Sequence, residues 1–165
     1  MKISKDFAFD AAHRLHLVRE DHPCRNLHGH RYQITVQVYA VHIDTMVIDY
    51  RDLSCIKEWI DGMIDHSTLI SKDDAILRQL AEANPEVFGK IFIFPIKETT
   101  TELMAEFFQY LFLSILEGRI GFKFGLAVSI KETPNTSAYT DFQISNQPVM
   151  RMRGHDEKES GKNSA

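Results

Sequence analysis

The sequence of 165 residues has little of what several large protein classes require. Two cysteines are too few for the disulfide framework of a small secreted domain, and no signal peptide is recognisable, so we expect a reducing, cytoplasmic compartment. No apolar run approaches the length of a membrane span. The 19 basic and 23 acidic residues give a formal net charge of −4. This charge argues against nucleic-acid binding through neutralisation of the phosphates. Neither a membrane nor a nucleic acid is an expected partner.

Histidine, in contrast, occurs eight times. The length fits one domain with a substantial core. Residues 149–165 are polar and lack apolar periodicity, so we expect them to form a disordered tail and place the fold in residues 1–148. The histidines are therefore the first feature of the domain that suggests specific chemistry.

Hydrophobic periodicity predicts an α+β domain whose helices cover one face of an antiparallel sheet. Apolar residues at every second position predict strands, and a period near 3.6 predicts helices. The last helix is expected to begin at Thr99, whose hydroxyl and Glu102 fit a capping box. Strands are expected within residues 3–11, 32–40, 91–94, 122–130 and 139–144, and helices within 53–64, 75–83 and 99–118.

Three histidines continue the apolar faces of the first two strands. His13 is in phase with the first strand, while His28 and His30 are in phase with the second. If these strands pair as a hairpin, the three imidazoles converge at one end of the sheet. Neutral imidazoles suit zinc, and three protein ligands leave one position open. The alternative is that the three are polar residues at a loop edge whose hydrogen bonds are satisfied. The histidines His16, His22, His42 and His155 lack this phasing and are expected at the surface.

Cys24 lies four residues before His28 and has two interpretations. As a fourth zinc ligand it would close the site and make it structural. As a free thiol near a metal, Arg25 and Arg31, it would favour the thiolate and act as a base or nucleophile. Cys55 falls within a helical pattern and is expected to pack in the core.

Asp65 and His66 follow the first predicted helix directly. An adjacent carboxylate and imidazole can relay protons, because the acid orients and charges the base. Alternatively, they form a helix-ending turn with a histidine near the negative end of the dipole.

Glu132 continues the apolar face of the strand around residues 122–130. A carboxylate there needs a partner, and a ligand with two N–H groups would be one. Alternatively, the strand has ended and Glu132 is solvated before the turn at 133–135.

Six segments in order resemble the family of 6-pyruvoyl-tetrahydropterin and 6-carboxy-tetrahydropterin synthases. No single motif is decisive, but the ordered set is specific and spans nearly the whole chain short of the tail. The segments are residues 9–15 (FDAAHRL), 24–32 (CRNLHGHRY), 46–50 (MVIDY), 65–66 (DH), 100–102 (TTE) and 131–133 (KET).

This resemblance implies a tunnelling fold (T-fold): a four-stranded antiparallel sheet with helices on one side. Such subunits assemble into barrels, commonly a homohexamer built as a dimer of trimers, with active sites between subunits. It also implies roles for matching residues. The three histidines hold catalytic zinc, Cys24 abstracts a proton with the support of Asp65 and His66, and Glu132 anchors the pterin ring.

The three residues between Cys24 and His28 resemble the short spacing of the carboxy synthase of queuosine biosynthesis. The implied reaction converts 7,8-dihydroneopterin triphosphate to 6-carboxytetrahydropterin with release of acetaldehyde and triphosphate. The alternatives are the pyruvoyl synthase of biopterin biosynthesis and a non-catalytic protein that binds zinc or pterin. Three positions depart from the family pattern in the pocket region: Thr45, Ile70 and Thr99.

Overall fold

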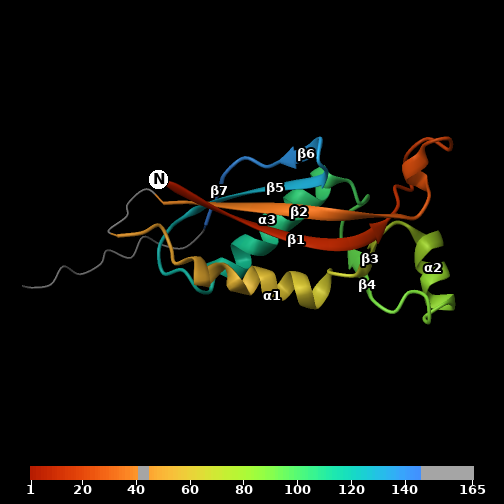
Figure 1. Ribbon diagram of the computed structural model, residues 1–165, viewed down its shortest axis with the longest axis horizontal. Coiled ribbons are helices and arrows are strands. Elements are labelled where there is room, and N and C mark those ends of the chain that lie inside the picture. Colours follow the sequence, from red (N-terminus) through yellow and green to blue (C-terminus); the bar gives the residue numbers. More distant parts are fainter. Residues whose placement is uncertain (41–44, 146–165) are drawn as a thin grey trace, which may run out of the picture.

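The computed structural model describes residues 1–40 and 45–145, and in this part of the chain strands and helices alternate in an α+β order (Figure 1). His42, His155 and the predicted tail lie outside the described residues. The strands are β1 (Lys2–His13), β2 (His28–Tyr39), β3 (Ser67–Ser71), β4 (Ile91–Phe94), β5 (Gly125–Thr133), β6 (Thr136–Tyr139) and β7 (Gln143–Ile144), and the helices are α1 (Ser54–Met63), α2 (Ala75–Ala83) and α3 (Thr101–Glu117).

The hairpin of β1 and β2 dominates the sheet. The two strands pair antiparallel without interruption from Lys2 opposite Tyr39 to His13 opposite His28. Alternate residues of β1, such as Phe7 and Phe9, are buried because successive side chains point to opposite faces. The end of β1 therefore meets the beginning of β2, as the periodicity predicted.

The sheet is larger than expected and mixed in direction. Its order is β4-β3-β1-β2-β5-β6, with β7 also paired to β5, and β3 runs parallel to both β1 and β4. The expectation of four antiparallel strands was therefore wrong in number and direction. β3 was not predicted from hydrophobic periodicity. Its residues Leu69 and Ile70 are both fully buried, on opposite faces, so apolar and polar residues do not alternate.

The last predicted strand, 139–144, is also wrong, because the chain forms the separate strands β6 and β7 there. Between them, the Thr140 hydroxyl lies 2.9 Å from the Val128 nitrogen and accepts its hydrogen bond. A side chain thus takes the place of a backbone carbonyl in the ladder. β5 also begins later than the predicted 122, at Gly125.

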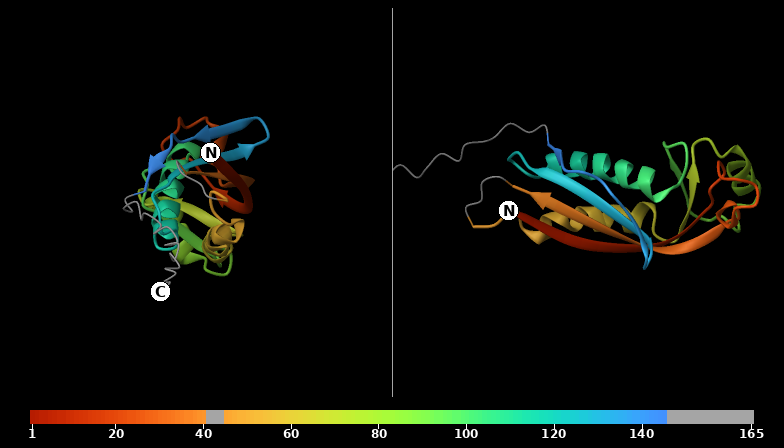
Figure 2. Two further views of the ribbon diagram at one scale, coloured as in Figure 1. Left: turned by 90° about the vertical axis from the view of Figure 1, so that its left-hand side faces the viewer. Right: turned by 90° about the horizontal axis from the view of Figure 1, so that it is seen from above.

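Helices α1 and α3 pack on one face of the curled sheet, as expected, and enclose the main core (Figure 2). The shorter α2 contributes to a small second core beside β3. In it, Leu77, Ala81 and Phe88 pack on Ile70. Since Leu69 belongs to the main core and its neighbour Ile70 to the second, α2 covers the opposite face of β3. No helix within the described ranges is both long and apolar enough to cross a membrane.

The start of α3 differs by one residue from the prediction. Thr100, not Thr99, is the N-cap, with its side chain accepting from the Leu103 N–H. The Thr99 hydroxyl instead donates to the Arg14 carbonyl at 3.0 Å. This difference of one residue places the Thr99 backbone beside the histidines.

Candidate metal centre and its neighbouring groups

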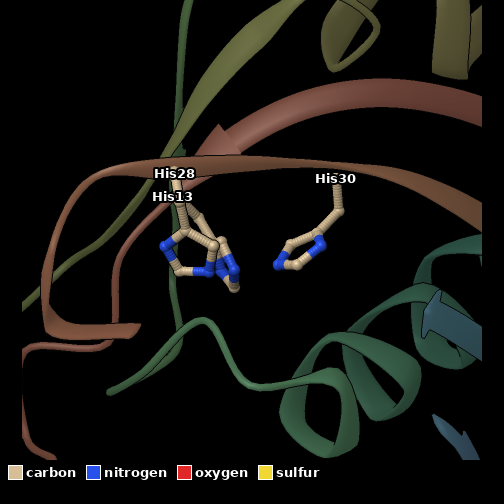
Figure 3. A group of neighbouring side chains, drawn as sticks. All are labelled: His13, His28 and His30. Atoms are coloured by element: carbon tan, nitrogen blue, oxygen red, sulfur yellow. The ribbon is translucent and has the colours of Figure 1, made fainter. Parts of the chain in front are cut away.

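The three phased histidines converge, as predicted. His13 ends β1, His28 lies directly opposite on β2, and His30 follows two residues later on the same face. Their potential ligand atoms all lie within 4.8 Å of one another. Figure 3 shows the ring of His30 turned toward the other two. We call these three residues the histidine cluster.

Backbone carbonyls orient two of the rings. The Nδ1 atom of His13 lies 3.0 Å from the Thr99 oxygen, and that of His28 lies 2.7 Å from the Asn26 oxygen. A carbonyl only accepts, so each Nδ1 carries the hydrogen and each Nε2 presents a lone pair. This is the outer-shell arrangement that orients metal-bound histidines.

The Nε2 atoms of all three histidines are buried and none makes a hydrogen bond to a described residue, although the Oε1 atom of Glu132 lies 3.2 Å from that of His13. Burial without a partner costs free energy, and three such lone pairs at one point suit a cation. Burial is also the main reason that the pKa of His30 is lowered, which favours the neutral imidazole that metals bind. The donor set of three neutral imidazoles therefore fits zinc. Satisfied polar residues at a loop edge, the alternative, would not leave these atoms unpaired.

Glu132 turns toward the histidine cluster. Its Oε1 atom lies 3.2 Å from His13 Nε2 and 3.5 Å from His30 Nε2. β5 continues through this residue, so the alternative of a solvated glutamate beyond the strand is not observed. The approach of His13, opposed by burial, lowers the pKa of Glu132. Glu132 therefore places a carboxylate beside the point where the Nε2 atoms of the histidines converge.

Cys24 lies in a short 3₁₀ helix, Pro23–Arg25, and is a free, half-buried thiol. Its backbone is fixed, because its N–H donates to His22 Nδ1 and its carbonyl accepts from Leu15 N–H. Among the described residues, the group whose geometry suits a metal contains the three histidines without Cys24. The arrangement thus favours the free thiol over the fourth ligand.

The two arginines expected to favour the Cys24 thiolate have other partners. Arg31 follows His30 on β2, so its side chain points to the opposite face of the sheet. Its Nη1 atom lies 2.9 Å from Asp10 Oδ2. Arg25 donates to the carbonyls of His16 and Val18 and so closes the loop before Cys24. Both guanidinium groups thus make hydrogen bonds to groups other than the thiol, and their effect on the thiolate stays a prediction.

Asp65 and His66 form the expected pair at the edge of β1 that faces away from β2. Asp65 Oδ2 lies 3.0 Å from His66 Nδ1, and its Oδ1 accepts from the Asp10 N–H at 3.0 Å. Burial alone would raise the pKa of Asp65, but the hydrogen bonds from Asp10 and His66 outweigh it and lower the pKa. His66 itself has a left-handed backbone, with φ of 57°, and donates its N–H to the Asp10 carbonyl.

This pair opens to solvent rather than to the histidine cluster. The His66 side chain is 77% exposed. It lines an open groove of about 580 Å³ between β1 and α1, to which Lys5, Asp6, Arg31 and Lys57 also contribute. One chain therefore carries the two sets of groups on different sides of β1.

A buried network behind His13 has no counterpart in the sequence patterns. Glu98 is almost fully buried, accepts from the N–H groups of Thr99 and Leu17, and lies 3.2 Å from His16 Nδ1. His16 is therefore not the surface residue that was expected. Nearby, Arg14 makes two hydrogen bonds of 2.7 and 2.6 Å to Asp74, which raise the pKa of Arg14.

Tyr32 is a further residue of the site that was not predicted from the sequence. It is fully buried, and its hydroxyl also has no hydrogen-bond partner in the described part of the chain. Burial raises the pKa of Tyr32 far above its usual value, and negative charge on Glu132 and Cys24 adds to the effect. Its position in the HxHxY segment, in phase with both histidines, was the available signal.

With this geometry established, comparison with known proteins is informative. Residues 2–143 match the family described as 6-pyruvoyl tetrahydropterin synthase. The chain belongs to this family. Its T-fold, expected from the sequence, is accordingly confirmed, here with a mixed sheet of more than four strands.

Several relatives of this tetrahydropterin synthase family member are named 6-carboxy-5,6,7,8-tetrahydropterin synthase. The protein of Haemophilus influenzae is 34% identical over 116 residues, covering 67% of this chain and 81% of that protein. That of Rickettsia bellii is 28% identical over 141 residues, covering 82% and 96%. The match to the Rickettsia conorii protein, at 37% identity, covers 50% of this chain and 60% of that relative.

Solved structures agree on the fold. An uncharacterized protein from Wolinella succinogenes superposes with a TM-score of 0.71 at 22% identity, covering 85% of this chain and 97% of the other. The 6-pyruvoyl tetrahydropterin synthase of Plasmodium falciparum gives a TM-score of 0.62 at 17% identity, covering 85% and 96%. At these identities the likeness extends to the fold alone.

Proposed function

We propose that this protein is a zinc-dependent 6-carboxy-5,6,7,8-tetrahydropterin synthase, a lyase that cleaves carbon–oxygen and carbon–carbon bonds. Its substrate would be 7,8-dihydroneopterin triphosphate, and its products 6-carboxytetrahydropterin, acetaldehyde and triphosphate, with uptake of one water. The observation that carries the proposal is the convergence of three unpartnered Nε2 atoms in a member of this family. The names of the relatives favour the carboxy product. The three-residue spacing between Cys24 and His28 supports a role in queuosine biosynthesis, which we place in the cytoplasm.

His13, His28 and His30 would hold the zinc, which supplies Lewis-acid polarisation of the substrate's side-chain oxygens. The chain's own groups would do the rest. Cys24 takes a proton from the side chain, which requires its thiol to lose its own proton first. Glu132 accepts hydrogen bonds from N–H groups of the pterin ring and so fixes the side chain in reach of the histidine cluster. For that role it must turn from its present position beside His13.

Asp65 and His66 would return or relay the proton. Because His66 is exposed at the edge of β1, we place its function in a site shared with a neighbouring copy of the chain. A homohexamer, built as a dimer of trimers, would bring such copies together. The exposure of His66 at the edge of β1 supports a site shared between copies.

The direct test is incubation of zinc-loaded protein with 7,8-dihydroneopterin triphosphate, followed by mass analysis of the products. A carboxyl substituent on the tetrahydropterin, with acetaldehyde in equal amount, is expected. A pyruvoyl substituent would identify the protein as the pyruvoyl synthase instead. Absence of any turnover by the zinc-loaded oligomer would favour a non-catalytic binding protein.

A Cys24→Ala variant tests the role of the thiol. We expect it to retain zinc while turnover falls by about 100-fold or more, because the base is removed and the ligands remain. Zinc content after dialysis and the initial rate are the two measurements. Cys55→Ala is the matched control, since the Cys55 thiol is buried and donates to the Asp52 carbonyl. Loss of zinc from Cys24→Ala would make Cys24 a ligand and the site structural.

A further inference from the structure

Tyr32 borders the histidine cluster. It follows His30 by two residues on β2 and therefore projects from the same face. Its ring stacks on Phe9, with centroids 5.0 Å apart and planes 16° from parallel. It also meets the rings of His13 and His30 nearly edge-on, at 5.8 and 5.6 Å. The ring thus separates the histidine cluster from the aromatic core.

Packing explains the ring of Tyr32 but not its hydroxyl. The side chain has no exposed area, and its oxygen has no hydrogen-bond partner among the described residues. A buried hydroxyl without a partner destabilises the folded protein, and a phenylalanine would stack on Phe9 equally well. The hydroxyl therefore calls for a partner that the chain itself does not provide.

The surroundings of Tyr32 indicate which partner that is. Its ring touches two of the three histidines whose Nε2 atoms are also unpartnered. The carboxylate of Glu132, 3.2 Å from His13 Nε2, borders the same cluster. Four buried, unpaired polar atoms are thus contributed by one compact group of residues. The three nitrogens are acceptors, whereas the phenol can donate.

We propose that the Tyr32 hydroxyl donates a hydrogen bond to an anionic oxygen ligand that binds at the histidine cluster. A donor fixed in a buried site stabilises negative charge on oxygen without reorganising. In the proposed reaction, that oxygen belongs to the substrate's side chain. The inference rests on the metal site proposed above, and Tyr32 would select for ligands that present oxygen rather than nitrogen to the metal.

The test uses full-length protein loaded with cobalt, whose visible absorption reports ligand binding. The probes are acetohydroxamate, an anionic oxygen ligand, and imidazole, which when bound through one nitrogen has no free acceptor. We expect Tyr32→Phe to weaken acetohydroxamate binding about ten-fold and to leave imidazole binding unchanged. Tyr110→Phe, which removes a hydroxyl from an exposed residue of α3, is the matched control and should change neither.

A second measurement needs neither metal nor substrate. Thermal unfolding of the metal-free protein should show that Tyr32→Phe is more stable than wild type, with Tm higher by about 3 °C, because an unpaired buried hydroxyl is removed. A lower Tm would mean that the hydroxyl has a structural partner, and would overturn the proposal. Equal weakening of both probes, or of neither, would overturn it too. Failure of the wild type to bind cobalt would instead contradict the metal site itself.

Discussion

The histidine cluster and the Asp65–His66 pair lie on either side of the same strand but differ in completeness. In the cluster, His13 is buried and the other two histidines are half-buried, backbone carbonyls orient the rings of His13 and His28, and the ligand atoms of all three already converge. The pair is oriented equally well by the Asp10 backbone, yet its imidazole faces solvent across an open groove. One chain thus completes the metal-binding half of the proposed site, whereas the proton-transfer half is presented outward, where a second chain can use it.

The largest effect expected is on metal binding. His30→Ala should weaken zinc affinity by more than about 100-fold, because a ligand is lost rather than an outer-shell partner. His66→Ala, a change of the same size in the other region, should leave the zinc content unchanged. Metal analysis after dialysis against a weak chelator measures both. Similar losses of zinc from His30→Ala and His66→Ala would contradict the assignment of metal binding to the histidine cluster alone.

The next effect is on turnover and tests whether sites are shared. His66→Ala should lower the rate by about 100-fold because a proton-transfer group is lost. Mixed oligomers of His66→Ala and Cys24→Ala subunits should then recover about one quarter of the wild-type rate, since each site has an even chance of each intact group. The refolded or co-expressed mixture is compared with each variant alone. Without recovery, both groups would have to come from one chain.

The smallest effect concerns the support behind the cluster. Asp74→Ala should lower the unfolding free energy by about 3 kcal/mol, because Arg14 is left buried without its partner. Asp49→Ala, which breaks the more exposed Asp49–Arg51 pair, should change it less. Urea unfolding measures both. A larger effect of Asp49→Ala would contradict this order.

The same Asp74 variant has a defined pH dependence. Burial would raise the pKa of Asp74, but the bonds from Arg14 and the Leu77 N–H outweigh it, so the folded pKa lies below the unfolded one. The stabilisation is then complete above the ordinary aspartate pKa of about 3.9 and is lost as the pH falls through the folded pKa. The difference between wild type and Asp74→Ala should therefore be full at neutral pH and shrink below about pH 4.

The hairpin and the histidine cluster could be predicted because they depend on local periodicity. Phase along β1 and β2 placed His13, His28 and His30 on one face, and antiparallel pairing brought them together. β3 could not be predicted in this way, because a strand buried on both faces carries no alternation. The order of parallel strands is likewise set by packing rather than by the local sequence.

The supporting groups were missed for a related reason. Glu98 meets His16, and Thr99 meets Arg14, only when the segment before α3 docks beside the end of β1. Separations of 82 and 85 residues leave no sequence spacing to detect. Arg31 was expected near Cys24 because it is close in sequence. Its phase, opposite to that of His30, already indicated the other face of the sheet.

The unbroken ladder between β1 and β2 has a consequence for how this protein can vary. Side chains alternate with a period of two, so an odd change in the number of residues within β2 that slipped the register would turn His28 and His30 to the opposite face. The segment between the strands, residues 14–27, has no such parity. Natural or engineered length changes are therefore compatible with metal binding in this loop, whereas β2 tolerates them only in pairs or as a bulge.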